Sequence, residues 1–476
     1  MRPEIRLRRV IKKAALPPIM RGDKMSRRLT VFSLAIVVSL GIFFSGCGQK
    51  VEKATKATKA AKATKATKVA KGKVILTYGV WAQPAVIPLY EEIIRRFEKK
   101  YPGIKVRAQY GSGGPYIEKL KIELVGGSAP DLWMMDGQYV YNFAERGVLK
   151  NLTKWFHRDM KRKDYYCMDA VTDEQGRIWA VPYSFQSYAL YYNKDLFDAA
   201  GLAYPTKEWT WEDMVRAAKK LTRPEVGGKR IGQFGLGGTA FLISAVLARG
   251  IRSVEEEGGK LVARYNTPAL QEALREYVEL RNKDKVIPSQ EVLNTLGTSA
   301  RLFAQGRLGM WLGLYYAVSV IKKDNPGLRY DVALPPRAMV GKMRTGYYVP
   351  NIFGITASAS WERQQAAWKF IKFFSSYKIQ KLFGRKGQGF PFLKRAAQAL
   401  VKEHRGNPAH LKVFLESIKS TVPYIPSYSE GRTSAYAESQ GKAESYLEQA
   451  IVGNVSVQAA CRQAQRAAQT ILDNAK

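Results

Sequence analysis

Residues 74–136 alternate between apolar strands and amphipathic helices, and this alternation restricts the possible folds more than any other feature. The segment 74–80 is mostly apolar and 104–110 alternates strictly between apolar and polar residues, so both are predicted as strands. Apolar residues at helical spacing follow each strand, and residues 131–135 form a third apolar run. Strands separated by helices in this way form a parallel sheet built from right-handed βαβ units. The sequence therefore predicts an α/β fold.

Two polar or aromatic residues directly follow strands of this predicted sheet. Trp81 follows the first strand and Asp136 follows the third. Ligands of parallel α/β sheets bind beyond the carboxyl ends of the strands. Both side chains are therefore predicted to face a binding crevice.

Residues 177–214 predict a passage from one part of the molecule to another. They contain a predicted strand at 180–183, a dense aromatic run, a second strand at 188–192 and a short helical turn at 194–200. Another helix is predicted after Thr210 because residues 210–213 have the form of a capping box. In this motif a hydroxyl and an acidic side chain each accept a hydrogen bond from the other residue's backbone N–H.

The order of these segments resembles the lobe-to-lobe crossover of extracellular solute-binding proteins of ABC importers, the maltose-binding-protein-like family. The matching pieces are WAVP at 179–182, YYNKDLF at 191–197, AGL at 200–202 and TWE at 210–212. Further matches are YPGI at 101–104, GSAPDL at 127–132 and FAQGRLGMW at 303–311. The resemblance covers residues 74–472.

The resemblance implies a periplasmic-binding-protein-like fold of type II, with two α/β lobes joined by a hinge. Each lobe is expected to have a mostly parallel sheet flanked by helices. The expected division is 74–185 for the first lobe, 186–346 for the second lobe, 347–395 for the return to the first lobe, and 396–476 for C-terminal helices mainly on the second lobe. The implied function is capture of a carbohydrate by hinge closure and its delivery to ABC permease subunits, without enzymatic activity.

Sugars present flat C–H faces rimmed by hydroxyl groups, so a carbohydrate site needs aromatic rings for the faces and polar groups for the rims. Residues at predicted strand ends and near the expected cleft supply both kinds. The predicted ligand-binding residues are Trp81, Asp136, Tyr183, Phe185, Gln186, Gly237, Trp311, Tyr315, Tyr347, Arg344 and Arg385. For every aromatic residue among them the alternative is core packing. Core packing is the expectation for Trp133, Trp155, Trp179, Trp361 and Trp368.

The formal net charge is +37, of which the first 73 residues contribute +16 and the remaining residues +21. A basic body attracts anions in general. One alternative is therefore an anionic ligand, an oligouronide or a glycerophosphodiester, held by Arg344 and Arg385. We favour the other explanation, a solvated surface charge. A sensor or scaffold that feeds no permease is a further alternative.

The N-terminal region predicts secretion and membrane anchoring. Residues 29–44 are mostly apolar, follow two arginines and end close to Cys47, a pattern that resembles the lipobox of bacterial lipoproteins. Met25 is a better start than Met1 for such a signal. Residues 50–73 repeat Lys with Ala and Thr and have no apolar face. We therefore predict a signal peptide at 1–46 and an extended tether at 47–73. We expect a monomer, lipid-anchored in the cell envelope and facing the periplasm or exterior, that binds no nucleic acid.

The sequence contains no motif for a metal, a cofactor or a catalytic nucleophile. Its three histidines lie in separate segments, and no HExxH, CxxC, Walker A or GxSxG motif is present. We therefore predict no metal and no cofactor. Besides Cys47, only Cys167 and Cys461 remain. A disulfide is possible in an oxidising compartment, but two separate thiols are the preferred interpretation.

Overall fold

The computed structural model describes residues 73–223, 232–238, 241–341, 344–423 and 433–474. By its internal contacts the chain divides into Met1–Lys71 and Gly72–Lys476. The predicted signal, Cys47 and the tether lie outside the described residues. Everything below concerns the second unit.

The first part of this unit is the predicted parallel sheet. β1 (Val74–Trp81) pairs in parallel with β2 (Ile104–Gly111) and with β3 (Leu132–Asp136). The helices α2 (Ile87–Lys100) and α3 (Gly113–Val125) make the connections. These strands and helices confirm the βαβ pattern read from the sequence.

Two long strands cross the centre of the sheet. In the order β2-β1-β3-β10-β4-β8-β5, β10 (Tyr347–Ile355) and β4 (Val181–Asn193) lie in the middle. The prediction of two strands at 180–183 and 188–192 was wrong, because β4 is one strand of 13 residues. Its first half pairs with β10 and its second half with β8 (Leu308–Leu314), so hydrogen-bond partners are available along its whole length.

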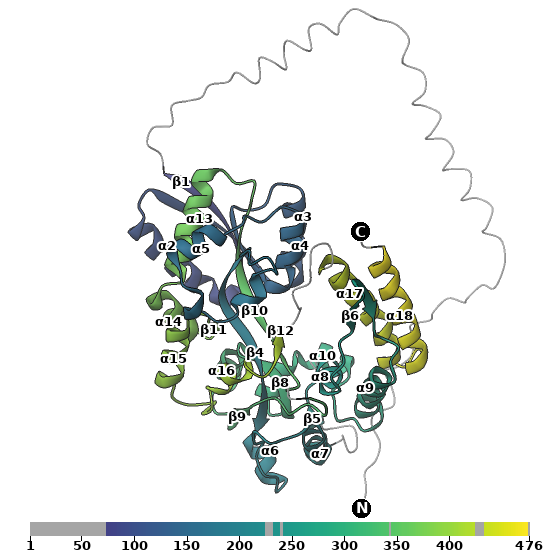
Figure 1. The fold of residues 1–476 in the computed structure, drawn as a ribbon. Helices are drawn as coiled ribbons and strands as arrows, with labels where there is room; N and C mark the ends of the chain where they lie inside the picture. The colour runs from purple at the N-terminus through teal and green to yellow at the C-terminus, as the bar shows by residue number, and fades with distance from the viewer. Residues whose placement is uncertain (1–72, 224–231, 239–240, 342–343, 424–432, 475–476) are drawn as a thin grey trace, which may run out of the picture. The chain divides into compact units, whose positions relative to one another are not determined.

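The second part of the unit lies around β8. β5 (Phe234–Leu236) pairs in parallel with β8, and β9 (Tyr330–Ala333) pairs with β4. The C-terminal helices α17 (Thr433–Ile451) and α18 (Val457–Asp473) pack against each other and against α9 (Pro268–Val278), as Figure 1 shows in yellow and teal. Figure 1 also shows β4 running from the part that holds β1, α2 and α13 to the part that holds β8 and β5. The boundaries expected for the two lobes stay a prediction.

The remaining elements connect and cover these strands. They are η1 (Pro84–Val86), η2 (Gly137–Tyr139), α4 (Val140–Glu145), α5 (Thr153–Asp159), η3 (Arg162–Asp164), η4 (Met168–Val171), α6 (Lys194–Ala199), α7 (Trp211–Leu221), α8 (Phe241–Ala248), β6 (Val254–Glu257), β7 (Lys260–Ala263), η5 (Glu279–Lys283), α10 (Gln290–Leu296), α11 (Ser299–Ala304), α12 (Ala317–Asp324), α13 (Trp361–Phe374), α14 (Tyr377–Arg385), β11 (Phe390–Pro391), α15 (Lys394–Glu403), α16 (Val413–Ser417) and β12 (Val422–Pro423).

The capping box predicted before α7 is confirmed. The Asp213 N–H donates to the Thr210 hydroxyl oxygen, and the Asp213 carboxylate accepts from the Thr210 backbone N–H at 2.9 Å. Cys167 and Cys461 are both free, as the preferred interpretation expected, although Cys461 is buried and Cys167 is only half-buried.

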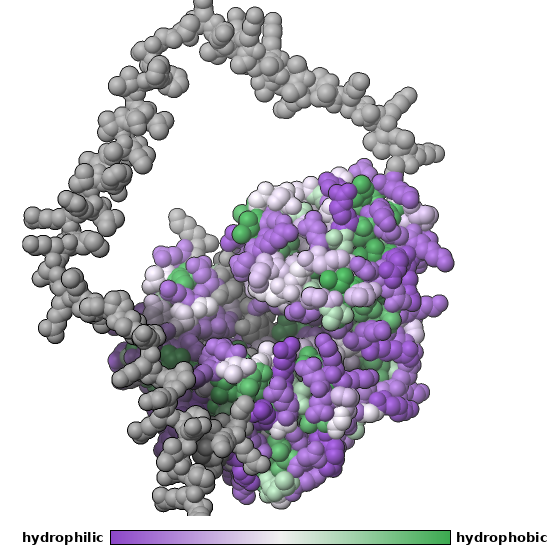
Figure 2. Space-filling view, turned by 180° about the vertical axis from the view of Figure 1, so that it is seen from behind, coloured by the Kyte–Doolittle hydropathy of each residue, from purple (hydrophilic) through white to green (hydrophobic). Residues whose placement is uncertain are grey.

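Most of the tryptophans expected in the core are there. Trp133, Trp155 and Trp368 are buried, and Trp179 is half-buried. The expectation for Trp361 was wrong, because its exposed fraction is 57%. Trp361 is the first residue of α13, and its ring forms an edge-to-face pair with the Trp155 ring at a centroid distance of 5.6 Å, with Lys150 Nζ 5.9 Å from the Trp361 ring centroid. Outside the core, Figure 2 shows hydrophilic residues over most of the face seen from behind, with apolar residues in small separate patches.

Candidate ligand-binding site

Asp136 lies at the carboxyl end of β3, beside the returning strand β10. It is opposite Asn351 in the antiparallel register of the two strands. The next residue, Gly137, lies so close to β10 that a Cβ there would be 2.6 Å from Pro350 Cγ. Trp81, half-buried, ends the neighbouring strand β1. The two predicted residues therefore do lie at the ends of adjacent strands.

Burial changes the acidity of Asp136. It raises the pKa of the carboxyl group from 3.8 to about 7. The group also interacts electrostatically with Tyr139 and Tyr183. Near neutral pH it can therefore exist as an acid or as a carboxylate, and it can donate a hydrogen bond to a ligand oxygen or accept one from a ligand hydroxyl.

Gln186 connects the crossing strand β4 to two other segments. Its Oε1 accepts a hydrogen bond from the Tyr316 N–H at 3.2 Å, and its Nε2 donates to the Gln388 carbonyl at 3.4 Å. The second contact requires a close approach at Gly389, whose φ is +145° and where a Cβ would lie 2.6 Å from Ser184 Oγ. Glycine is needed there for both reasons. Gln186 thus holds together the segments after β8 and before β11.

Trp311, in the middle of β8, packs against glycines. A Cβ on Gly237 would lie 2.7 Å from Trp311 Cδ1, and a Cβ on Gly313 would lie 2.7 Å from Trp311 Cζ3. A side chain at either position would displace the indole. Gly237 directly follows β5, so the predicted residues Gly237 and Trp311 meet just beyond the carboxyl end of that strand.

A cavity of about 500 Å³ lies next to Trp311. Its aromatic lining residues are Tyr188, Trp311 and Tyr316, and its polar ones are Gln290, Asn294, Thr298 and Ser299 of the α10–α11 region. None of the described residues that line it is charged. We call this space the Trp311 cavity. Its volume lies within the usual range for small-molecule sites, about 300–1,000 Å³.

The indole N–H of Trp311 is buried and has no hydrogen-bond partner among the described residues. A buried donor without a partner costs free energy, roughly 1–3 kcal/mol. A ligand oxygen that accepted from this N–H would recover that cost. The Trp311 cavity itself combines an aromatic wall with neutral amide and hydroxyl groups.

Tyr347 supports this cavity from the return strand. Its hydroxyl lies 2.9 Å from the Tyr188 hydroxyl, and the two ring centroids are 4.5 Å apart. Tyr347 is itself buried. It therefore orients Tyr188, which lines the cavity.

A model of the bacterial extracellular solute-binding protein family matches residues 82–381, which is more than half of the chain. The chain belongs to this family. Asp136, Gln186, Gly237 and Trp311 all lie inside the matched range.

Relatives and solved structures agree with this assignment. The maltotriose-binding protein of Pyrococcus abyssi is 22% identical over 313 residues, which are 64% of this chain and 63% of that protein. The ABC substrate-binding protein of Listeria monocytogenes in complex with cycloalternan has a TM-score of 0.73 and 23% identity, over 84% of this chain and 99% of that one. UgpB of Mycobacterium tuberculosis in complex with glycerophosphocholine has a TM-score of 0.70 and 19% identity, over 84% and 99%. At these identities the solved structures establish the shared type II binding-protein fold.

Three of the predicted ligand-binding residues lie in the core instead of on a cavity wall. Phe185 has no exposed surface and stacks on Phe390 at a centroid distance of 5.6 Å. Tyr183 is buried among phenylalanines, and Tyr315 is buried with its hydroxyl donating to the Gly384 carbonyl at 3.3 Å. In this structure they have almost no surface to offer a ligand. Alternation along a strand sends neighbouring side chains to opposite faces, and the sequence did not show which face was the core.

The two predicted arginines are engaged away from the Trp311 cavity. Arg344 donates to the carbonyls of Pro335 and Lys207, at 2.9 and 2.8 Å. Arg385 forms an ion pair with Glu403. Neither lines the Trp311 cavity, which weakens the case for them as partners of an anionic ligand.

Several cavity residues were not predicted from the sequence. Tyr188 and Tyr316 are close in sequence to the predicted residues Gln186 and Tyr315. The tyrosine pair at 315–316 is visible in the sequence, but only Tyr315 is among the predicted ligand-binding residues. Tyr316 is 40% exposed, whereas Tyr315 is buried. Gln290, Asn294 and the Thr-Ser pair at 298–299 carry no recognisable motif, and only the folded chain brings them to Trp311.

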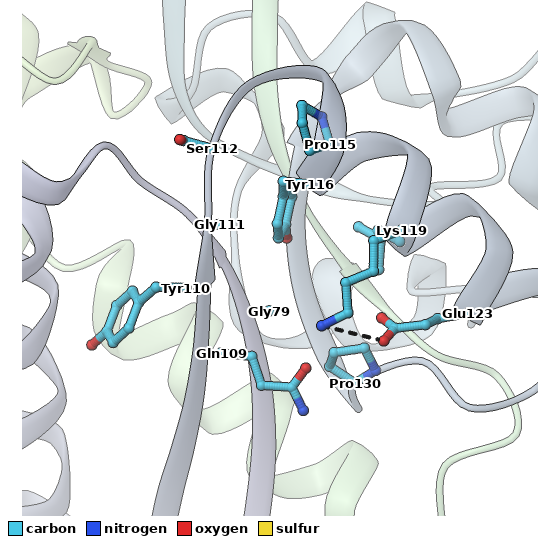
Figure 3. Close-up of a pocket in the computed structure, with 11 residues that line it drawn as sticks. Gly79, Gln109, Tyr110, Gly111, Ser112, Pro115, Tyr116, Lys119, Glu123 and Pro130 are labelled. Atoms are coloured by element: carbon cyan, nitrogen blue, oxygen red, sulfur yellow. Dashed lines mark ion pairs between the residues drawn. The ribbon is translucent and has the colours of Figure 1, made fainter.

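A second, smaller cavity of about 210 Å³ lies between α3 and the strands β1 and β2 (Figure 3). Tyr116 lies across Gly111, where a Cβ would be 2.7 Å from its Cδ2, and its hydroxyl donates to the Met134 carbonyl at 2.9 Å. Lys119 and Glu123 form an ion pair at 3.5 Å beside it (Figure 3). None of the predicted ligand-binding residues lines this space.

Within the described parts of the chain, no group of three or more His, Cys, Asp or Glu side chains is placed to hold a metal ion. The helices described there include none that is long and apolar enough to span a membrane.

Proposed function

We propose that this protein is the membrane-anchored substrate-binding component of an ABC importer, and that it captures a neutral carbohydrate and passes it to the permease. The family assignment supports a solute-binding role. The Pyrococcus protein is named for maltotriose and the Listeria structure contains cycloalternan, and both ligands support a saccharide. In this proposal the protein binds its ligand without chemical change.

The Trp311 cavity carries the proposal. A sugar ring stacked on Trp311, Tyr188 or Tyr316 would bury its C–H face against an aromatic surface. The rim hydroxyls would meet Gln290, Asn294 or Ser299, and one ring or hydroxyl oxygen could accept from the buried Trp311 N–H. A neutral polar ligand with alternating apolar faces and hydroxyl edges fits this combination.

The electrostatics of the cavity favour a neutral ligand over an anionic one. Among the residues that the structure describes, neither a lysine nor an arginine lines the cavity. Arg344 and Arg385, the expected partners of an anion, make their contacts elsewhere. In this proposal the net charge of +21 on residues 74–476 is a solvated surface charge, which is the interpretation that the sequence analysis favours.

In this proposal the ligand also contacts the ends of β1 and β3, where Trp81 and Asp136 lie. A ligand shifts an open–closed equilibrium only by as much as it binds the closed state more tightly. Contacts from both parts of the sheet supply that difference. The crossing strands β4 and β10 would act as the hinge.

The anchoring part of the proposal rests on the sequence alone. The apolar segment 29–44 and Cys47 at its end support a lipoprotein signal. The lysine-rich residues 50–73 would hold the folded part away from the membrane surface. We propose an envelope location facing the periplasm or exterior, and a monomer.

The test is a set of calorimetric titrations of the full chain, purified in detergent, with maltotriose, cycloalternan, an oligogalacturonide and glycerophosphocholine. We compare the wild type with Trp311→Phe, which keeps an aromatic ring and removes the N–H. A neutral hydrogen bond contributes about 1 kcal/mol, so affinity for a saccharide should fall about fivefold. Trp361→Phe is the matched control because Trp361 is exposed on α13 and outside the cavity.

Saccharide binding that is weakened in W311F and unchanged in W361F supports the proposal. Binding of glycerophosphocholine or the uronide alone, with equal affinity in W311F, would replace it by the anionic alternative. If circular dichroism shows a folded chain and none of the four compounds binds, the sensor or scaffold alternative is favoured.

A further inference from the structure

A third cavity, of about 580 Å³, lies on another side of the crossing strands. It is bordered by four basic residues, namely Arg162, Lys163, Lys394 and Lys419, and by the tyrosines Tyr165, Tyr166 and Tyr348. We call it the basic cavity. It shares no lining residue with the Trp311 cavity.

Two consecutive residues of β10 show how the two cavities are related. Successive side chains of a strand point to opposite faces of the sheet. Tyr347 contacts Tyr188, which lines the Trp311 cavity, whereas Tyr348 lines the basic cavity. The basic cavity therefore lies on the face of the crossing strands opposite to the proposed carbohydrate site.

The charges around the basic cavity are not balanced. Its lining contains one carboxylate, Asp169, which pairs with Arg162. Lys394 Nζ donates to the Lys163 carbonyl at 2.7 Å, which uses no negative charge. The side chains of Lys163 and Lys419 form no ion pair with a described residue and are exposed. Three lysines thus line the cavity without a carboxylate partner among the described residues.

The titratable groups in the wall do not supply the missing negative charge. Burial raises the pKa of the Cys167 thiol, so this group stays protonated at neutral pH. Burial likewise raises the pKa of Tyr348. Both groups border the cavity as neutral side chains, and the Tyr348 hydroxyl can donate a hydrogen bond.

The aromatic walls are held in place by core residues. Tyr165 stacks on Phe392 with a centroid distance of 4.7 Å and an interplanar angle of 17°. Tyr166 meets the edge of Phe185 at 5.6 Å, and Lys394 Nζ lies 5.5 Å above the Tyr166 ring. Fixed rings next to cationic groups suit a ligand that has a flat apolar face and an anionic substituent.

We propose that the basic cavity is a second binding site, for a sugar-sized organic anion that carries a phosphate or carboxylate group. The anionic group lies between Lys163, Lys394 and Lys419, and the body of the ligand lies against the tyrosines. The site is independent of the carbohydrate site, and its existence does not depend on the proposed transport function.

The test uses glucose 6-phosphate, with glucose and inorganic phosphate as partial ligands, in calorimetric titrations of the full chain at constant ionic strength. The double variant Lys163→Gln, Lys419→Gln removes the two unpaired charges and keeps the Lys163 carbonyl. The control Lys369→Gln, Lys378→Gln removes two exposed lysines of α13 and α14, so the net charge of both variants is the same. Binding of glucose 6-phosphate should weaken at least about tenfold in K163Q/K419Q only.

Trp311→Phe distinguishes this site from the proposed carbohydrate site. Glucose 6-phosphate should bind W311F as it binds the wild type, and glucose alone should not compete for it. The proposal fails if the folded wild type does not bind the sugar phosphate. It also fails if K163Q/K419Q and K369Q/K378Q lose the same affinity, or if W311F is the variant that loses it.

Discussion

At the scale of single residues, Asp136 is a half-buried acid at the end of a strand. Burial raises its pKa to about 7, and its neighbours in the register belong to the return strand. A carboxyl group of this kind couples protonation to the stability of the fold and to the contacts that a ligand can make. Trp311 is comparable, since its buried N–H lacks a partner among the described residues.

The pKa of Asp136 predicts the direction of a pH effect on stability. Its folded-state pKa of about 7 lies above the value of 3.8 expected without burial, so between these pH values the folded state binds more protons than the unfolded state. The free energy of unfolding should therefore fall as pH rises from about 4 to about 7 and then level off. Asp136→Asn removes this contribution.

Urea unfolding of the wild type and D136N at pH 5 and pH 8 measures the contribution of Asp136 to the pH dependence of stability. The free energy of unfolding of D136N minus that of the wild type should be larger at pH 8 than at pH 5, because only the wild type loses stability between these pH values. Asp164→Asn is the control, because Asp164 is exposed. Equal differences between wild type and D136N at the two pH values would show that Asp136 does not titrate in this range.

At the scale of elements, local sequence motifs decide where helices begin. The capping box at Thr210 satisfies backbone donors at the start of α7. The buried residues Trp211 and Met214 of this helix belong to a hydrophobic cluster in the part of the sheet around β8. The helix α3 begins differently, since its N-cap residue Ser112 makes no side-chain capping hydrogen bond. Thr210 and Ser112 are both hydroxyl-bearing N-cap residues, and only Thr210 makes a capping hydrogen bond, so Ser112 serves as the control for Thr210.

Thr210→Ala should lower the free energy of unfolding by about 1 kcal/mol because it removes the capping hydrogen bond. Ser112→Ala should change it by less than about 0.5 kcal/mol. Denaturant midpoints at constant slope report both values. A loss in S112A equal to that in T210A would mean that the hydroxyl groups act through something other than capping.

At the scale of the whole molecule, the two parts of the sheet share strands and share a core. One hydrophobic cluster contains Tyr78 and Trp133 from the first part together with Tyr191 and Trp311 from the second. β4 pairs with strands of both parts. The binding-protein fold is therefore stabilised as one unit across its crossing strands.

This shared core predicts that the folded part unfolds in a single cooperative transition. Unfolding of one part alone would expose residues that both parts bury. Far-UV circular dichroism reports the helices, and tryptophan fluorescence reports residues of both parts, so the two urea curves should coincide. Two separate transitions would show that β4 and the shared core do not couple the parts.

The sequence determined the local features of this protein, because these depend on residues close together in the chain. Helical and strand periodicity predicted β1, α2, β2, α3 and β3, and the motif at 210–213 predicted the start of α7. The dense matches of residues 74–472 predicted the family. Placing Asp136 and Trp81 at strand ends needed only the rule that a parallel sheet has one carboxyl edge.

The tertiary structure alone decided which side chains meet. It buried Phe185, Tyr183 and Tyr315, exposed Trp361, and joined the two predicted strands around Gln186 into β4. It brought residues 290–299 to Trp311, and residues 162–169 to Lys394 and Lys419. Period-two alternation gives two faces for a strand, and only the packing of distant segments determines which face becomes the core and which lines a cavity.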